Sequence, residues 1–356
     1  MTAAPRALAL IAATTALVGT AMMAPTQAAA PVELQPEDLT RGADIAVAHI
    51  EDGDFVLGDR TVDVGGGRAY LLGKSAKAWL VGTSDEAGGG KFRIVRVKPD
   101  DTTTVIKRGI SFFELELSEN GRYFVHAGRG TRKALPIRVF SSRTGDLKTE
   151  MDFANYPDVI GMDGPRVLLS TWTKGDTGIK SWDTTTDAVT KLSRRPANLV
   201  DIGNDLLASY TKDPYQDGCM VITRLSDPST RLWRSCTERV AAFSPDGDRI
   251  ATVHILSDGI GPGEVWEREL DGTLLGDYST NWFGRIAFED DTDLLLDVNG
   301  DTQSATARCS EGVCENATDP VAVQQPRLSP TSGLGRPSQR FGSVGAAAGA
   351  WQTPQS

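Results

Sequence analysis

The amino-acid sequence predicts an all-β fold made of repeated four-stranded antiparallel sheets, and three observations support this prediction. A strand–turn–strand segment, clearest at residues 242–254, recurs along the chain. Its copies end at residues 82, 126, 170, 209, 254 and 297, at intervals of 44, 44, 39, 45 and 43 residues. A second pair of strand-like segments follows most copies. A period of roughly 40–45 residues is typical of four-stranded propeller blades, so we predict a single β-propeller.

The clearest copy contains the turn sequence Ser-Pro-Asp-Gly at residues 244–247. Proline presets φ, aspartate can cap its own backbone and glycine accepts a positive φ, so these residues predict a tight turn. The β-branched and apolar residues 250–255 predict the strand that follows. The other copies cover residues 70–82, 115–126, 159–170, 199–209 and 286–297, and the second pairs cover residues 92–101, 136–147, 178–189, 220–232 and 264–275.

Six complete units are expected, and an incomplete blade precedes them. The complete units cover residues 68–108, 109–156, 157–197, 198–238, 239–281 and 282–320. Three short strands are expected at residues 45–50, 54–57 and 60–64, and residues 321–325 could supply the fourth strand of that blade. This closure would join both ends of the array and remove its open sheet edges. The propeller would span residues 43–325, which fits seven blades of about 40 residues slightly better than six.

Over residues 43–325 the chain resembles the WD40-like and TolB-like propeller families. The resemblance rests on the turn at residues 244–247 and on the strand end Ser181-Trp182-Asp183. That is the single Trp-Asp pair in the repeats, and the Gly-His partner of true WD40 repeats is absent. The resemblance implies the propeller fold and leaves the function open.

The two ends of the chain differ from the repeats. Residues 1–30 contain one basic residue, a short apolar stretch and a small-residue cleavage site, which together predict a bacterial signal peptide. The apolar stretch is shorter than the roughly 20 residues that span a bilayer, so we favour cleavage over a membrane anchor. We expect a secreted protein, extracellular or associated with the cell wall. Residues 31–42 are expected to be a flexible lead, and residues 326–356, rich in Pro, Gly, Ala and Ser, a disordered tail.

Charge and cysteine content exclude some functions. A net charge of −10 argues against nucleic acid or anionic membranes as partners. Four cysteines in an exported chain predict disulfides. Cys309 and Cys314 flank a turn, while Cys219 and Cys236 lie at the starts of the segments expected to form the last two strands of one blade. We therefore favour the pairs Cys219–Cys236 and Cys309–Cys314 over the other pairings and over a zinc site, which would require Cys-x-x-Cys spacing.

All three histidines are expected at one position of the repeat. His49, His126 and His254 each follow two mostly apolar residues in the predicted second strand of a unit, and Asp297 has the same place in the last unit. One interpretation is a polar ring that contacts a ligand, and the other is that these side chains hydrogen-bond neighbouring backbone. Equivalent positions in adjacent blades lie about 10 Å or more apart. Because metal–nitrogen bonds are about 2 Å long, the histidines are not expected to share a metal ion.

Two acidic segments lie in the last predicted unit, at residues 289–293 and 297–301. Residues 289–293 occupy the place of the Ser-Pro-Asp-Gly turn, and we expect a solvated turn. Asp297, Asn299 and Asp301 match positions 1, 3 and 5 of a calcium loop, but Thr and Arg stand where such a loop needs glycine and a bidentate acid. They are at most a weak calcium site.

No catalytic motif was found. A Gly-x-Ser-x-Gly nucleophile elbow is absent, which excludes the arrangement of prolyl oligopeptidases, and the sialidase Asp box is absent too. The sequence favours an exported, monomeric, non-catalytic propeller without a cofactor that binds or scaffolds an extracellular protein, a peptide or a cell-wall glycan. The alternative is a propeller-type glycoside hydrolase or lyase with carboxylates and His126 or His254 in its central funnel.

Overall fold

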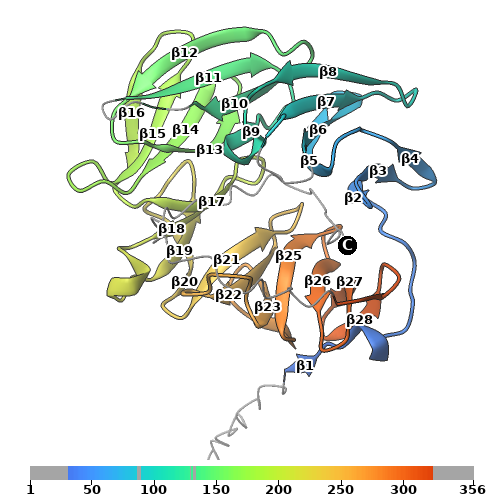
Figure 1. The fold of residues 1–356 in the computed structure, drawn as a ribbon. Helices are drawn as coiled ribbons and strands as arrows, with labels where there is room; N and C mark the ends of the chain where they lie inside the picture. Colours follow the sequence, from blue (N-terminus) through green and yellow to red (C-terminus); the bar gives the residue numbers. More distant parts are fainter. Residues whose placement is uncertain (1–30, 86–89, 129, 131–133, 324–356) are drawn as a thin grey trace, which may run out of the picture. The chain divides into compact units, whose positions relative to one another are not determined.

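The structure, a computed structural model, describes residues 31–85, 90–128, 130 and 134–323. The predicted signal peptide and tail lie outside these residues. The described chain forms seven consecutive β-sheets and three short 3-10 turns, η1 (Pro36–Asp38), η2 (Phe112–Glu114) and η3 (Pro214–Gln216) (Figure 1). None of the helical segments in this part of the chain has the length and apolar character needed to cross a membrane. The sheets form a seven-bladed β-propeller, which confirms the predicted fold class.

Six sheets contain four consecutive antiparallel strands each, and each sheet matches one predicted complete unit to within one residue. Their strands are β5 (Arg68–Ser75), β6 (Ala78–Ser84), β7 (Arg93–Val97) and β8 (Thr103–Arg108); β9 (Leu115–Leu117), β10 (Tyr123–Ala127), β11 (Leu135–Ser141) and β12 (Leu147–Phe153); β13 (Asp158–Asp163), β14 (Arg166–Thr171), β15 (Gly178–Asp183) and β16 (Val189–Ser193); β17 (Ala197–Asp201), β18 (Leu206–Tyr210), β19 (Met220–Arg224) and β20 (Arg231–Ser235); β21 (Glu238–Phe243), β22 (Arg249–His254), β23 (Glu264–Glu269) and β24 (Leu274–Ser279); β25 (Trp282–Phe288), β26 (Leu294–Asn299), β27 (Gln303–Ser310) and β28 (Val313–Asn316). The first sheet has three strands, β2 (His49–Glu51), β3 (Asp54–Leu57) and β4 (Arg60–Val62).

The predicted tight turn forms, and side-chain hydrogen bonds hold it. The Ser244 hydroxyl donates to Asp246 Oδ1 at 2.6 Å and accepts the N–H of Arg249 at 2.9 Å. Gly247 has a φ of 78°, which favours glycine. In the third sheet Ser118 accepts and donates in the same way, with Asn120 in place of the aspartate. The repeat is therefore set by local turn chemistry.

The hydrophobic core lies between successive sheets. Trp182, from the predicted Ser-Trp-Asp strand end, is completely buried in the fourth sheet. Its ring packs against Phe153 of the preceding sheet, with 5.6 Å between ring centroids. First strands of successive sheets also contact each other, from β2 and β5 through to β21 and β25. Each sheet thus buries its apolar faces against its neighbours.

The predicted closure of the propeller is wrong. β29 (Val321–Ala322) pairs with Gln303 and Ser304 of β27, so it extends the last sheet, and the first sheet keeps three strands. The backbone N–H groups of residues 317 and 318 both donate to the carbonyl of Thr306 in β27. These bonds direct the chain along the edge of β27.

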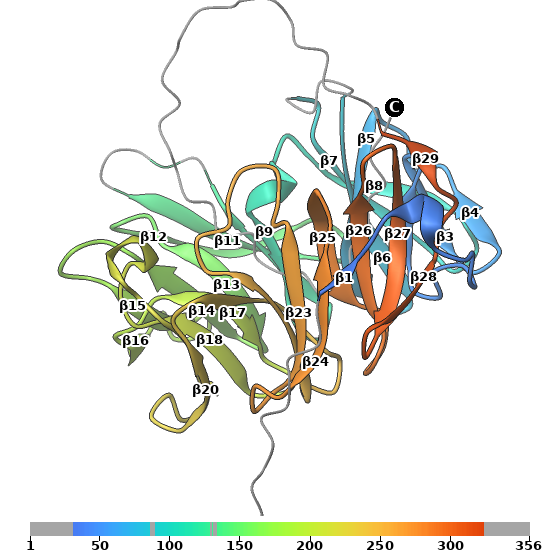
Figure 2. The ribbon, with the colours of Figure 1, turned by 90° about the horizontal axis from the view of Figure 1, so that it is seen from below.

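The segment before the first sheet has a structural role that the sequence did not suggest. Residues 31–42 were expected to be flexible. In the structure, β1 (Val32–Glu33) pairs in parallel with β24, and Arg41 forms a parallel bridge with Asn316 of β28. The Asn316 side chain donates to the carbonyl of Pro36 at 2.7 Å. The segment therefore lies along the outer edges of the last two sheets (Figure 2).

An ion pair at the last sheet holds the residues that lead into the first sheet. Arg308 of β27 donates to the carbonyls of Ala43 and Asp44, both at 3.0 Å, and forms an ion pair with Glu289. Glu289 also accepts the backbone N–H of Ala46. We call Arg308, Glu289 and residues 43–46 the ring latch, because they join the first and last sheets.

The ring latch changes the interpretation of the acidic run at residues 289–293. The Glu289 side chain is 5% exposed and faces Arg308. The rest of the run forms the expected turn, in which Asp290 Oδ1 accepts the N–H groups of Thr292 and Asp293, both at 2.8 Å. The prediction of a solvated run is therefore wrong for its first residue.

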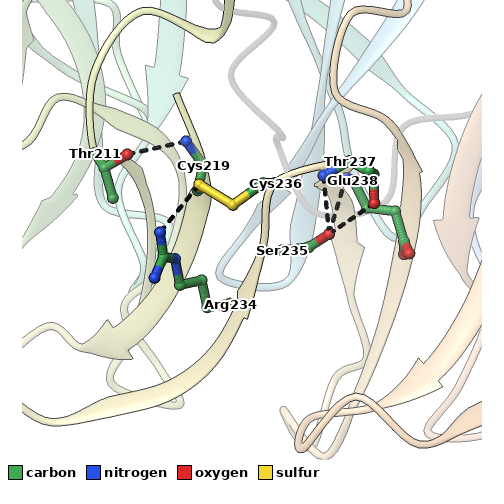
Figure 3. The surroundings of a disulfide bond; sticks show 7 residues. All are labelled: Thr211, Cys219, Arg234, Ser235, Cys236, Thr237 and Glu238. Carbon is green, nitrogen blue, oxygen red and sulfur yellow. Dashed lines mark hydrogen bonds between the residues drawn. A yellow bond between two sulfur atoms is a disulfide. The ribbon is translucent and has the colours of Figure 1, made fainter. Parts of the chain in front are cut away.

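The structure holds both favoured disulfides, Cys219–Cys236 and Cys309–Cys314. Cys219 precedes β19, and its N–H donates to the Thr211 hydroxyl at 2.9 Å (Figure 3). Cys236 follows the end of β20, whereas we expected it at the start of a strand. Antiparallel pairing explains the difference, because it places the start of one strand opposite the end of its partner.

Removing the disulfides should lower the melting temperature. The bridges close loops with sequence separations of 17 and 5 residues. Chain entropy then predicts a loss of about 3 kcal/mol for Cys219→Ser with Cys236→Ser and about 2 kcal/mol for Cys309→Ser with Cys314→Ser. Thermal unfolding of both double variants and of reduced protein measures this. An unchanged melting temperature with four titrated thiols would contradict it.

Candidate functional site

Three of the four predicted ligand-contact residues occupy matched places in the sheets. His126 lies in β10, His254 in β22 and Asp297 in β26, each the second strand of its sheet. His49 begins β2, which is a first strand and contacts the first strand β5, so its predicted register is wrong. We expected one strand over residues 45–50. In the structure residues 45–48 lie outside any strand, and β2 begins only at His49.

Two histidines are held by nearby backbone. His49 is 3% exposed, and its Nδ1 donates to the carbonyl of Val47 at 2.9 Å. His254 is exposed, and its Nδ1 accepts the N–H of Leu256 at 3.2 Å. No hydrogen bond or ion pair joins any two of the three histidines and Asp297 within the described residues.

Burial changes the acid–base chemistry of His126. It is 5% exposed, and its Nδ1 has no hydrogen-bond partner among the described residues. Burial, together with the charge of Arg138 on the neighbouring strand, lowers the pKa of His126 to about 4. The ring is therefore neutral at pH 7.

Acidification should destabilise the protein through His126. Its folded-state pKa of about 4 lies below the ordinary value of about 6.5. The unfolded chain therefore binds this proton first, and the free energy of unfolding falls as the pH drops from about 6.5 to 4, by about 3 kcal/mol in all. Urea unfolding of wild type and His126→Gln across this range should give a shallower pH dependence for the variant. Parallel curves would contradict this assignment.

Asp297 is buried, and both of its carboxylate oxygens accept hydrogen bonds. Its Oδ1 accepts the Thr306 hydroxyl at 2.8 Å, and its Oδ2 accepts the backbone N–H of Arg285 at 3.4 Å. Burial raises the pKa of Asp297 to about 6, against the opposing effect of the Arg285 charge. Asn299 is also buried in β26, while Asp301 is exposed and accepts a hydrogen bond from an asparagine side chain. In the described chain no three His, Cys, Asp or Glu side chains gather into a metal-binding group.

Sequence reasoning missed two carboxyl groups on first strands. Glu116 lies in β9, and burial raises its pKa to about 8, with no charged neighbour contributing. Asp158 lies in β13, which contacts β9. Burial and, to a smaller extent, the charge of Glu114 raise the pKa of Asp158 to about 6. Glu116 alternates with two leucines, as a solvent-facing strand residue does. Its position on the predicted first strand of a unit was the sequence signal that could have identified it.

A pocket of about 720 Å³ lies at one end of the second sheet. It is lined by residues next to or at the start of β5, the end of β6, the start of β7 and the end of β8, which meet because alternate strands run in opposite directions. The lining residues are Gly66, Gly67, Ser84, Asp85, Lys91, Phe92, Arg93, Arg108 and Gly109. Three positive side chains and one carboxylate make this lining cationic. No sequence pattern had marked any of these residues as part of a site.

No family model and no curated protein matches the sequence. Among solved structures, the chain is similar to an oligogalacturonate lyase in complex with manganese, with a TM-score of 0.50, 12% identity and coverage of 72% of this chain and 82% of that one. It is also similar to TolB from Acinetobacter baumannii, with a TM-score of 0.44, 14% identity and coverage of 65% of this chain and 60% of that one. An uncharacterised protein from Listeria monocytogenes EGD-e gives a TM-score of 0.46 and 13% identity, with 76% and 85% covered.

At 12–14% identity these similarities show the fold alone. The chain is a seven-bladed β-propeller, as its resemblance to the WD40-like and TolB-like families implies. The chain spans 60% of the length of the TolB structure that it matches.

Proposed function

We propose that this protein is an exported, non-catalytic binding module. The observation that carries the proposal is the cationic pocket of the second sheet. Guanidinium and ammonium groups remain charged at neutral pH and suit the binding of an anion. Among the described lining residues, Asp85 is the one carboxylate, and it accepts the backbone N–H of Gly90 at 3.2 Å. The described lining holds no histidine that could exchange protons near pH 7.

Export is supported by the cysteines. All four are paired in disulfides, and such bonds persist in oxidising compartments outside the cytosol. These bonds support our proposal that the protein functions outside the cell or at the cell wall. We propose that it acts there as a monomer that takes an extracellular ligand.

A glycoside hydrolase or lyase is the second candidate, and Glu116 is the observation that favours it. With a pKa of about 8, its carboxyl group is protonated at pH 7 and could donate a proton. A glycosidase needs a second carboxyl group about 5–10 Å away. Asp158, on the contacting first strand, is the candidate for that role.

One experiment separates the two candidates. The secreted protein is immobilised and exposed to culture-medium and cell-wall fractions, and the same fractions are assayed for new reducing ends or unsaturated sugars. Specific retention of a protein, peptide or glycan without cleavage would support a binding module. Cleavage that is lost in Glu116→Gln, with retention unchanged, would overturn it in favour of an enzyme.

A further inference from the structure

We propose that the pocket of the second sheet binds a small organic molecule that carries two or more carboxylate or phosphate groups. The inference rests on the proposed binding function and assigns it a site and a ligand chemistry. Carboxylates and phosphates share the geometry and charge that guanidinium groups recognise.

The described lining of the pocket carries an excess of positive charge. Lys91, Arg93 and Arg108 line the pocket, and none of them forms an ion pair within the described residues. Elsewhere Arg249 and Arg308 each pair with two carboxylates. The whole chain has a net charge of −10, so carboxylates are plentiful. Three positive charges around one pocket repel each other, and an anion bound between them would offset this repulsion.

The guanidinium group of Arg93 is held in place at the pocket. Its Nε donates to the Thr83 hydroxyl at 3.2 Å, which fixes one edge of the guanidinium group. Neither of its Nη atoms has a hydrogen-bond partner among the described residues. Gly66 has a φ of 118°, and a Cβ there would lie 3.1 Å from Arg93 Nη2 and 3.0 Å from the carbonyl oxygen of Ser84. A larger residue at position 66 would therefore displace the guanidinium group.

Backbone hydrogen bonds frame the pocket. The Gly67 N–H donates to the carbonyl of Ser84, and the Gly109 N–H donates to that of Phe92, both at 2.9 Å. These bonds tie β5 to β6 and β7 to β8 at the pocket. A fixed frame reduces the ordering that ligand binding requires.

The pocket has the size of a small-molecule site and a lining that is partly apolar. The Phe92 ring packs edge-on against Phe112, with 5.4 Å between centroids, and supplies an apolar wall. A volume of about 720 Å³ lies within the range of small-molecule sites and far exceeds the size of one inorganic ion. Among the described lining residues, three positive side chains and Asp85 give a net charge near +2, which suits a ligand with two or more negative charges.

The test titrates isotope-labelled protein with citrate, a tricarboxylate, and with fructose 1,6-bisphosphate, followed by backbone amide NMR signals. Fructose at the same concentrations and sodium chloride at the same ionic strength are the controls. We expect saturable shifts at Gly66, Gly67 and Gly109. Saturation with citrate alone would assign carboxylates as the preferred group, and saturation with the bisphosphate alone would assign phosphates.

Matched variants test the site. Lys91→Gln with Arg108→Gln should weaken binding of the active probe at least tenfold. Arg143→Gln with Lys148→Gln removes two exposed positive charges from the third sheet and should leave the affinity unchanged. Equal weakening in both variants, or no saturable shift with either probe, would overturn the proposal. If the Lys91→Gln with Arg108→Gln protein still retains its extracellular ligand, the binding function stands and the pocket assignment fails.

Discussion

Replacing Arg308 by alanine should lower the free energy of unfolding by about 3–5 kcal/mol. The change would leave the enclosed Glu289 carboxylate without its ion-pair partner and would free the carbonyls of Ala43 and Asp44. Removing one member of a buried pair costs more than the pair itself contributes, because a charge remains in a poorly solvated place. Urea unfolding at pH 7 measures the loss.

Two further variants make the test of the ring latch specific. Arg138→Ala breaks a half-exposed ion pair with Glu150 and should cost at most about 1 kcal/mol. Adding Glu289→Gln to Arg308→Ala should recover part of the loss, because a neutral amide oxygen still accepts the N–H of Ala46. Losses of the same size in Arg308→Ala and Arg138→Ala would show that the latch has no special role.

Glu267→Ala is expected to have a comparable effect, about 3–5 kcal/mol. Glu267 in β23 is fully buried, and its carboxylate pairs with Arg249 at 2.9 Å. It also accepts the Tyr278 hydroxyl at 2.8 Å and the backbone N–H of Glu311 at 3.0 Å. The alanine variant would leave each of these donors without this acceptor. Thermal and urea unfolding measure the change.

The network around Glu267 joins two sheets, and this allows a sharper test. Glu311 lies in the turn between β27 and β28, whereas Glu267 belongs to the preceding sheet. Glu269→Ala, on the same strand, is the control and should cost well under 1 kcal/mol. Tyr278→Phe removes one hydroxyl and should cost about 1–3 kcal/mol. A Glu267→Ala protein as stable as the Glu269→Ala protein would refute the role of the network.

The sequence predicted the repeating part of the fold because its signals are local. The turn at residues 244–247 depends on side chains two to five residues apart. The spacing between copies of this segment along the chain predicted the six four-stranded sheets. The closure could not be predicted in this way. Arg41 and Asn316 are 275 residues apart, and no repeat period encodes their pairing. The placement of His49 failed for a related reason, since it lies where the repeat is incomplete.

The candidate sites were harder to predict than the fold. Glu116 has the alternation of a solvated strand residue, yet it is half-buried, and the desolvation that raises its pKa follows from the position of β9 among the first strands. Lys91, Arg93 and Arg108 span 18 residues of sequence and meet because antiparallel strands bring alternate ends together. Charge patterning along the chain does not show such a meeting. The disulfide pairs, in contrast, were predictable, because both lie within single units.

The order in which the chain is made gives the N-terminal segment a further consequence. Residues 32–46 emerge before the rest of the propeller. Their partners lie in β24 and in or beside the last sheet, and they emerge after most of the propeller. Contacts of such high sequence separation are slow to form, because loop-closure entropy opposes them until the intervening chain has folded. The six inner unit boundaries can assemble while synthesis continues, but the seventh must wait for the whole polypeptide. Ring closure is therefore expected to be the last step of folding, and a chain that stops before β27 should remain an open array.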